Sequence, residues 1–363
     1  KEALEVLESG LILLCLDDAE DPCWSYRQSA LRYWHGNISC GGNRWFDKPI
    51  QLVVSMQNGK MGYTGEHSMN DGMHALAFSQ YLRGQSYKNQ QSSLESTRAS
   101  DINPKVSNVF QDLYAGLSSD ERKVMEGLID KAKSDYMDLV NAYDVHLESF
   151  WGYGLTYIKA AGFSPDAYIQ MAIQLASYRL FGKQVGTYEA THVRPFLHGR
   201  TETIRSVTRE SNAFVQAMGL RANFGKDSTT SRSTQVTLLH EATKSHVVYT
   251  RKAHQAQGVD RHFFGLMMAA TDDSALPPAL FSHPLFERSK RWRITSSSLP
   301  TTMSGFGPAV SDGVGVGYDL RDNHCFFTVT ARKEHGFTDA FCHLVEEAML
   351  EMKFIIEMEG TVN

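Results

Sequence analysis

Strand-like and helix-like stretches follow one another in this chain without a regular alternation, and this order limits the folds that are open to it. An apolar run at residues 11–16 and a hairpin pattern at 51–67 come early, whereas two further strand patterns, at 314–320 and 325–331, come only near the end. The Asn58-Gly59 pair between the arms of the hairpin is typical of a tight turn. Helical patterns separate these strands, and no internal repeat is found. The mixed order favours an α+β architecture.

The helical segments carry recognisable starts and ends. In residues 164–182, Ser164 stands at the N-cap, Pro165 and Asp166 fall in the first turn, and Gly182 follows the last turn. Similar patterns predict helices over residues 67–82, 118–150, 238–258 and 337–358. His67 therefore lies at a junction between a strand and a helix, where a side chain can face a cleft.

The chain is long enough for two domains, since its 363 residues exceed the usual size of one domain. Residues 86–106 are polar and rich in Ser and Asn, which is typical of a linker. We therefore expect one domain over residues 1–106 and a second over residues 107–363.

Composition excludes several classes of protein. The net charge is −5, and no block of Lys and Arg indicates a nucleic-acid partner. No apolar run approaches the length of a membrane span, so a transmembrane segment is not expected. The five cysteines are odd in number and lack a Cys-x-x-Cys pair, which argues against a disulfide framework and a zinc site. We expect no metal and a reducing compartment.

The first residues, KEALEVLESG, lack an initiator methionine and carry no targeting pattern. We interpret the sequence as part of a longer chain, so that a natural targeting segment is not visible. The last residues, EGTVN, are not a peroxisomal Ser-Lys-Leu address.

His67 is a candidate base because Asp71 lies four residues after it and a glycine follows the aspartate, in the pattern H-x-x-x-D-G. A carboxylate can orient an imidazole and leave its other nitrogen to take a proton. The short pattern also fits a histidine that packs at a junction. The pattern alone leaves both interpretations open.

Longer motifs give the chain a specific resemblance. GNRWFDKP at residues 42–49, the His67 segment, TYEATHVRPFLHGRTETIRS at 187–206 and GVDRHFFGL at 258–266 occur in the order found in the carnitine/choline acyltransferase family. The chain resembles that family, most closely its members that acetylate carnitine, over roughly their C-terminal three fifths. The resemblance implies two domains with mixed sheets, each similar to chloramphenicol acetyltransferase, with a reaction tunnel between them. The first domain would be incomplete in this chain.

The resemblance also implies a reaction, which is the reversible transfer of an acyl group between CoA and the hydroxyl of carnitine. His67 would be the general base and Asp71 would hold its ring, with no acyl-enzyme intermediate. Ser297 would donate a hydrogen bond to the oxyanion. Relatives carry Ser-Thr-Ser followed by Gln at this point, whereas this chain has Thr295-Ser296-Ser297 followed by Ser298.

Carnitine has a carboxylate at one end and a trimethylammonium group at the other. By resemblance, Tyr188 and Thr201 contact the carboxylate, Arg261 favours carnitine over choline, Thr295 contacts carnitine, and Phe306 contacts the ammonium group. Thr201 and Arg261 together are the useful discriminator, because choline has no carboxylate.

For CoA, the resemblance implies contacts to Lys159 and Asp166. Leu155 stands where relatives have an earlier lysine, and the loss of one exposed phosphate contact should weaken CoA binding by about 1 kcal/mol. CoA is a cosubstrate, so no cofactor is expected. Small residues at 304–305 predict tolerance of acyl chains longer than acetyl. The alternating glycines at 313–317 are expected to let a ligand pass close to a strand.

Two alternatives stay open at this point. Besides a carnitine O-acyltransferase, the sequence leaves open a choline acetyltransferase and an inactive fragment or binding homologue of the family. We expect a monomer in an intracellular location, mitochondrial or peroxisomal, with the cytosol as a further option.

Overall fold

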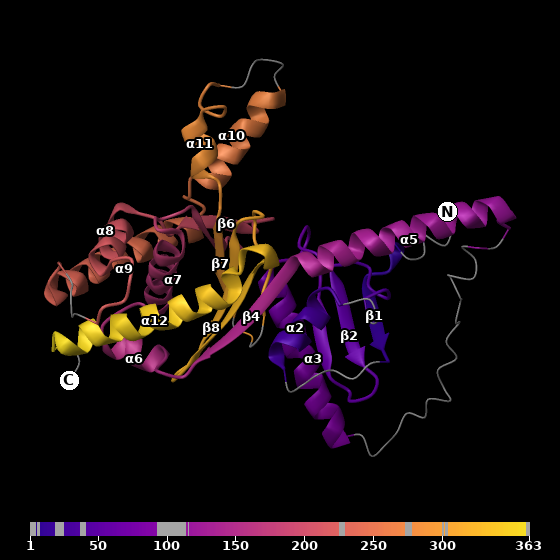
Figure 1. The fold of residues 1–363 in the computed structure, drawn as a ribbon, viewed down its shortest axis with the longest axis horizontal. Coiled ribbons are helices and arrows are strands. Elements are labelled where there is room, and N and C mark those ends of the chain that lie inside the picture. The colour runs from indigo at the N-terminus through magenta and orange to yellow at the C-terminus, as the bar shows by residue number, and fades with distance from the viewer. Residues whose placement is uncertain are drawn as a thin grey trace. The chain divides into compact units, whose positions relative to one another are not determined.

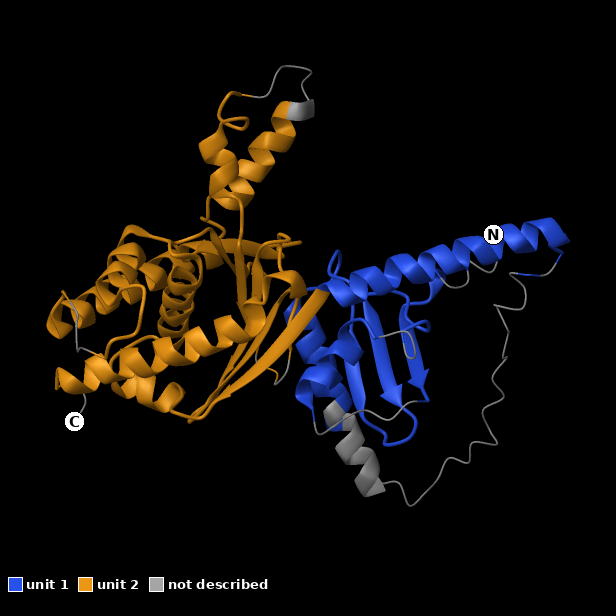
Figure 2. Ribbon diagram, viewed as in Figure 1, with its two compact units in different colours: residues 1–142 blue, residues 143–363 orange. Residues whose placement is uncertain are grey.

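The computed structural model describes residues 8–18, 25–36, 41–92, 116–224, 229–272, 278–299 and 304–360, together with residues 5, 114 and 301. The chain divides into two compact units, Lys1–Ala142 and Tyr143–Asn363 (Figure 2). The domain boundary predicted at residue 106 lies outside the described residues. In the described part of the chain, no helix combines the length and the apolar composition that crossing a bilayer requires.

Unit 1 contains a three-stranded mixed sheet in the order β1-β2-β3 (Figure 1). β1 runs parallel to β2, and β3 runs antiparallel to β2. The predicted strand at 11–16 and the predicted hairpin are confirmed. Gly59 has a φ of +68°, and the connection between the two arms is longer than a two-residue turn. The elements of this unit are β1 (Ile12–Asp17), α2 (Tyr26–Trp34), β2 (Ile50–Ser55), β3 (Met61–Thr64), α3 (Gly72–Ser92) and α5 (Ser119–Ala142).

The interior of unit 1 is held by charged groups. The Asp17 carboxylate at the end of β1 accepts two hydrogen bonds from the Arg44 guanidinium, at 2.9 and 3.0 Å, and one from Arg32 at 3.1 Å. The Asp17 and Arg44 side chains are fully buried. A bidentate pair of this kind fixes orientation as well as position. The motif at residues 42–49 therefore ties the connection before β2 to the end of β1.

Unit 2 is built on a six-stranded mixed sheet in the order β4-β9-β8-β7-β5-β6. β5, β7 and β8 are parallel neighbours, and the other pairs are antiparallel. The α+β class with mixed sheets is thus confirmed. The strands are β4 (Tyr143–Phe150), β5 (Thr187–His192), β6 (Thr201–Arg205), β7 (Ile294–Ser298), β8 (Val314–Leu320) and β9 (Cys325–Arg332). The helices are α6 (Leu155–Ala160), α7 (Pro165–Phe181), α8 (Arg209–Met218), α9 (Arg232–His254), α10 (Asp260–Asp272), α11 (Pro284–Ser289) and α12 (Phe337–Met358).

An apolar core lies between the sheet of unit 2 and its helices. α7 is buried along most of its length, and its apolar side chains pack with those of α12 and of β8 and β9, including Leu175, Met349, Val316 and Val329. The fully buried side chains of β8 are Val314 and Val316, which alternate with glycines. This alternation shows that one face of the sheet meets the helices.

One predicted element was wrong in part. The helix expected over residues 118–150 ends at Ala142, and Tyr143–Phe150 forms β4, which pairs with β9 along its whole length. The ladder with β9 satisfies the backbone groups of this segment. The predicted helices near 164–182, 238–258 and 337–358 are confirmed as α7, α9 and α12.

The alternating glycines of β8 have a different partner from the expected ligand. A Cβ atom at Gly315 would lie 2.6 Å from the carbonyl oxygen of Phe306, and one at Gly317 would lie 2.7 Å from that of Ser304. The segment at 304–307 thus crosses the sheet face opposite the helices. The glycines make room for the chain's own backbone.

Candidate active site

The His67 segment leaves β3 and enters α3 beside the motif at residues 42–49. The Glu66 amide donates to the carbonyl of Lys48 at 3.1 Å, and the Tyr63 hydroxyl donates to the carbonyl of Pro49 at 2.9 Å. A Cβ at Gly65 would lie 2.2 Å from the Pro49 oxygen, so only glycine fits this approach. Residues just before His67 are therefore fixed by the motif.

His67 is accessible and oriented. Its side chain is 70% exposed, and Nδ1 lies 2.5 Å from the carbonyl oxygen of Asn70 and 3.7 Å from Oδ1 of Asp71. A carbonyl accepts only, so Nδ1 carries the proton of the neutral ring and Nε2 is the basic nitrogen. This geometry suits a general base.

In unit 2, β7 presents its side chains alternately to the two faces of the sheet. Ser296 is buried against α7, where its hydroxyl hydrogen-bonds Gln170. Thr295 and Ser297 therefore point to the opposite face. Thr295 pairs with Gly315 and Ser297 pairs with Gly317, so both hydroxyls lie on the face that the segment at 304–307 crosses.

Three residues predicted to bind carnitine lie together at the edge of this sheet. The Arg261 guanidinium donates from Nη2 to the Tyr188 hydroxyl at 3.4 Å and to Oγ1 of Thr201 at 3.2 Å. Its Nε donates to the Thr201 carbonyl at 2.9 Å. Among the described residues, no carboxylate pairs with Arg261. The result is an exposed cation beside two hydroxyl groups, which is a suitable site for a carboxylate.

Thr295 joins this group through the sheet. β5 and β7 are parallel neighbours in which Tyr188 pairs with Thr295. Thr295 is 8% exposed, and within the part of the chain that the structure describes its Oγ1 atom has no hydrogen-bond partner. A buried hydroxyl without a partner is unfavourable, and a ligand atom would satisfy it.

Phe306 lies on the same face as Thr295. Its carbonyl oxygen accepts a hydrogen bond from the Thr330 hydroxyl at 2.5 Å. Thr330 pairs with Gly315, and Gly315 pairs with Thr295. The Phe306 backbone is therefore bonded to β9, which lies two strands from Thr295 on β7.

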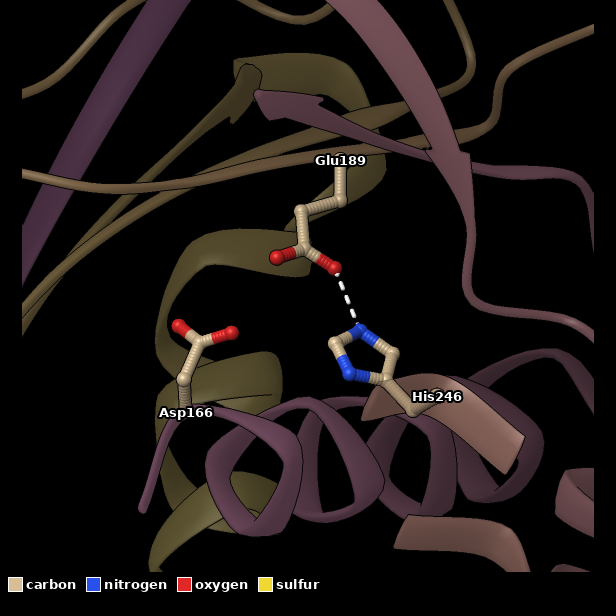
Figure 3. Close-up of side chains that lie close together, drawn as sticks. All are labelled: Asp166, Glu189 and His246. Atoms are coloured by element: carbon tan, nitrogen blue, oxygen red, sulfur yellow. Dashed lines mark hydrogen bonds and ion pairs between the residues drawn. The ribbon is translucent and has the colours of Figure 1, made fainter. Parts of the chain in front are cut away.

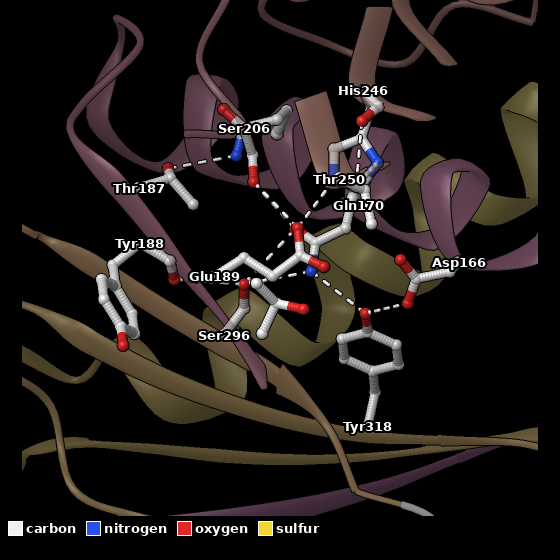
Figure 4. A network of polar contacts seen from close by, with 12 residues as sticks. Asp166, Gln170, Thr187, Tyr188, Glu189, Ser206, His246, Thr250, Ser296 and Tyr318 are labelled. Carbon is white, nitrogen blue, oxygen red and sulfur yellow. Dashed lines mark hydrogen bonds and ion pairs between the residues drawn. The ribbon is translucent and has the colours of Figure 1, made fainter. Parts of the chain in front are cut away.

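The two residues predicted to bind CoA have different surroundings. Lys159 is exposed on α6. Asp166, in the first turn of α7, accepts a hydrogen bond from the Tyr318 hydroxyl at 2.6 Å. Asp166 is therefore part of a polar network inside unit 2 (Figure 4).

This network contains residues that the sequence analysis did not single out. Glu189 and His246 are both buried and form an ion pair, with 2.6 Å between Oε2 and Nε2 (Figure 3). Burial by itself lowers the pKa of His246, but the charge of the Glu189 carboxylate, its hydrogen bond to the ring and the charge of Asp166 together outweigh burial, and the net pKa is raised. The sequence carried one signal for Glu189. Successive side chains of a strand point to opposite faces of the sheet, so Glu189 faces the helices if Tyr188 faces the other side.

Asp166, Glu189 and His246 offer ligand atoms that lie within 4.8 Å of one another. Two carboxylates and an imidazole are donor types that bind divalent cations. Each carboxylate nevertheless has a partner within the protein: Tyr318 for Asp166, and His246 and Ser206 for Glu189. The group is thus explained as a satisfied internal network.

With this geometry in view, comparison with known proteins identifies the family. The family model described as choline/carnitine O-acyltransferase matches residues 1–347. The chain belongs to the choline/carnitine O-acyltransferase family. The resemblance seen in the motifs is thereby confirmed.

Relatives within this acyltransferase family include enzymes named for each of the two alcohols. Carnitine O-acetyltransferase of Mus musculus is 29% identical over 98% of this chain and 55% of its own length. Choline O-acetyltransferase of Danio rerio is 31% identical over 97% of this chain and 54% of its own length. The chain therefore spans about half the length of the curated relatives it matches.

Two of the solved structures that are similar to this chain are named as acyltransferases. A wax ester synthase/diacylglycerol acyltransferase from Marinobacter aquaeolei VT8 has a TM-score of 0.38 and 10% identity, covering 95% of this chain and 81% of that one. A chloramphenicol acetyltransferase has a TM-score of 0.29 and 12% identity, covering 60% of this chain and 94% of that one.

Proposed function

We propose that the chain takes part in the reversible transfer of an acyl group between CoA and the hydroxyl of carnitine. The observation that carries the choice of carnitine is the Arg261 guanidinium, hydrogen-bonded to Tyr188 and Thr201 and without a carboxylate partner among the described residues. A carboxylate on the substrate would complete this group. Choline has only a hydroxyl and an ammonium group, so it offers nothing for the guanidinium to bind.

In this proposal His67 is the general base. Nε2 accepts the proton of the carnitine hydroxyl while the hydroxyl oxygen attacks the thioester carbonyl of acyl-CoA. The imidazolium that forms is stabilised by the Asn70 carbonyl and the Asp71 carboxylate. In the reverse direction the CoA thiol gives up its proton to the same nitrogen. The proton returns to the leaving group when the tetrahedral intermediate collapses.

The hydroxyls of β7 have separate roles. Ser297 donates a hydrogen bond to the oxyanion of the tetrahedral intermediate. Thr295, with its buried Oγ1, contacts carnitine together with Tyr188, and Phe306 contacts the ammonium end. Lys159 meets the phosphates of CoA, and Asp166 lies beside its pantothenate or adenine. CoA is a cosubstrate in this proposal, and the steps require no cofactor.

The test is thiol release from acetyl-CoA with carnitine, with choline and with neither. We expect release that depends on carnitine. Release that depends on choline would favour a choline acetyltransferase. The absence of release would favour a fragment or binding homologue.

Arg261→Gln sharpens the test. The loss of a charge-assisted hydrogen bond to a carboxylate costs about 1.5–3 kcal/mol, so KM for carnitine should rise about 10- to 100-fold. Arg251→Gln, which removes another exposed cation from unit 2, is the matched control and should leave KM unchanged. Equal values of KM in the two variants would contradict the assigned carboxylate contact.

Acyl-chain length and location are further parts of the proposal. From the small residues Ser304 and Gly305 we propose tolerance of acyl chains longer than acetyl. The glycine itself is required by close packing, because a Cβ at Gly305 would lie 2.6 Å from Cγ2 of Thr328. Activity confined to acetyl-CoA, among acetyl-, hexanoyl- and palmitoyl-CoA, would reject this tolerance. An intracellular monomer is proposed, and a relative from Saccharomyces cerevisiae named as mitochondrial supports a mitochondrial location.

A further inference from the structure

A buried side-chain network lies directly behind the strand that carries Thr295 and Ser297 (Figure 4). Ser296, between them, is 1% exposed, and Gln170 on α7 is fully buried. The Gln170 amide donates to the Ser296 hydroxyl at 3.1 Å and to the Tyr318 hydroxyl at 3.1 Å. The amide oxygen of Gln170 lies 3.3 Å from the Ser296 hydroxyl. Gln170 thus holds β7 and β8 to the same helix.

The same hydroxyl links β7 to β5. Ser296 Oγ lies 3.4 Å from the carbonyl oxygen of Tyr188, across a parallel ladder with only three register pairs. A ladder this short restricts strand position less than a long one does. The side-chain network therefore adds restraint at the point where Tyr188 and Thr295 lie side by side.

The far end of the network is charged. Ser206 donates to Glu189 at 3.2 Å and lies 3.5 Å from the Gln170 amide oxygen, and Glu189 pairs with His246 on α9. Asp166 and Tyr318 complete the other branch. Every member has a partner within the protein, so the network has a defined geometry, and fully satisfied buried networks of this kind add rigidity.

We propose that Gln170 and Ser296 are positioning residues for acyl transfer. They fix β7 against β5, and so hold the hydroxyls of Thr295 and Ser297 at a constant distance from the Tyr188 and Arg261 group on the opposite face. The inference rests on the proposed function. Neither Gln170 nor Ser296 needs to touch a substrate, since each acts through the residues on either side of Ser296.

α7 offers a matched control one turn further on. Gln174 is also fully buried, and its amide donates to the Thr187 hydroxyl at 3.1 Å. Both glutamines connect α7 to a strand. Only Gln170 contacts the residue between Thr295 and Ser297.

The experiment compares Gln170→Met and Gln174→Met with Ser296→Ala, a smaller change that is less disruptive to folding. A displacement of about 1 Å in a catalytic group costs up to about 100-fold in rate. We therefore expect kcat to fall about 10- to 100-fold in Gln170→Met and in Ser296→Ala. KM for acyl-CoA should stay within about threefold in all variants, because ground-state binding is not affected. Gln174→Met should keep kcat within about threefold.

Hydrogen exchange provides a second readout that does not depend on activity. Amides of residues 294–298 should exchange faster in Gln170→Met than in Gln174→Met at equal thermal stability. Equal exchange at β7 in the two variants, or full turnover in Ser296→Ala, would overturn the positioning role. If the unmodified protein shows no acyl transfer, the proposed function fails, and hydrogen exchange alone then decides whether Gln170 positions β7.

Discussion

The two units of the chain are stabilised by different interactions. Unit 2 has an extensive apolar core between its sheet and α7, α9 and α12. In the described part of unit 1, the buried apolar residues are Cys15, Val53 and Val140, and the apolar side chains of β1 are largely exposed, with Leu14 at 57% and Leu16 at 51%. Its buried interior is mainly polar, with Asp17, Arg32 and Arg44 at its centre. Unit 1 is therefore held by directional contacts, and unit 2 by packing.

This difference carries over to the candidate catalytic groups. The proposed base, His67, stands on an exposed segment whose position depends on hydrogen bonds to residues 48, 49 and 70. The hydroxyls of Thr295 and Ser297 stand on a strand whose other face meets a buried network. Changes near His67 should alter chemistry without altering stability, whereas changes behind β7 should alter both.

The largest expected effect is that of His67→Ala. Loss of general-base catalysis should lower kcat by between about 10² and 10⁴. The side chain is 70% exposed, so the free energy of unfolding should change by less than about 0.5 kcal/mol. Steady-state assays with acyl-CoA and carnitine, with chemical denaturation alongside, measure the two quantities.

His74→Ala is the control for this variant. His74 is exposed in the same segment, and its ring accepts only a long hydrogen bond of 3.4 Å from the Asp71 amide. We expect near-normal turnover. Comparable losses in the two histidine variants would show that the segment matters only for its conformation, and the assignment of His67 as the base would fall.

The next effect concerns the charged interior of unit 1. Arg44→Met removes the bidentate partner of a fully buried carboxylate while keeping similar volume. Breaking a buried ion pair costs about 3 kcal/mol at the lower end of the usual range. We expect a loss of this size in the free energy of unfolding, because Arg32 and Asn43 still contact Asp17. Denaturant unfolding should show this loss. Lys131→Met, at an exposed ion pair on α5, should lose less than about 0.5 kcal/mol.

The Asp17–Arg44 pair makes the stability of unit 1 depend on pH. Burial by itself raises the pKa of Asp17, but the hydrogen bonds from Arg44 and Asn43 and the charge of Arg44 outweigh it, and the net pKa is lowered. The ionised carboxylate therefore stabilises the folded unit above its unfolded pKa of about 3.9, and this contribution is lost as pH falls through the lower folded value. The stability difference between the wild type and Arg44→Met should narrow as pH falls below about 4. A constant difference over that range would contradict this account.

The sequence predicted much of this arrangement because several signals were local. Caps and periodicity located α7 and α12. Motif order identified the family and brought out Tyr188, Thr201 and Arg261, and in the structure Arg261 donates hydrogen bonds to the other two. β4 was missed because its pairing with β9 depends on residues almost 190 positions away. The buried network was missed for the same reason. Gln170 and Ser296 have ordinary neighbours in the sequence and meet only through the fold.

The smallest expected effect is that of a substitution in β1, and it tests whether this exposed strand contributes to the stability of unit 1. Leu14→Ser removes an apolar side chain that is 57% exposed, so little buried area is lost and the free energy of unfolding should change by less than about 1 kcal/mol. Leu175→Ala in unit 2 removes a fully buried side chain from α7 and should cost about 2–5 kcal/mol. Denaturant titration of both variants measures the contrast. A cost at Leu14 equal to that at Leu175 would mean that β1 is packed in solution and that the two units are stabilised in the same way.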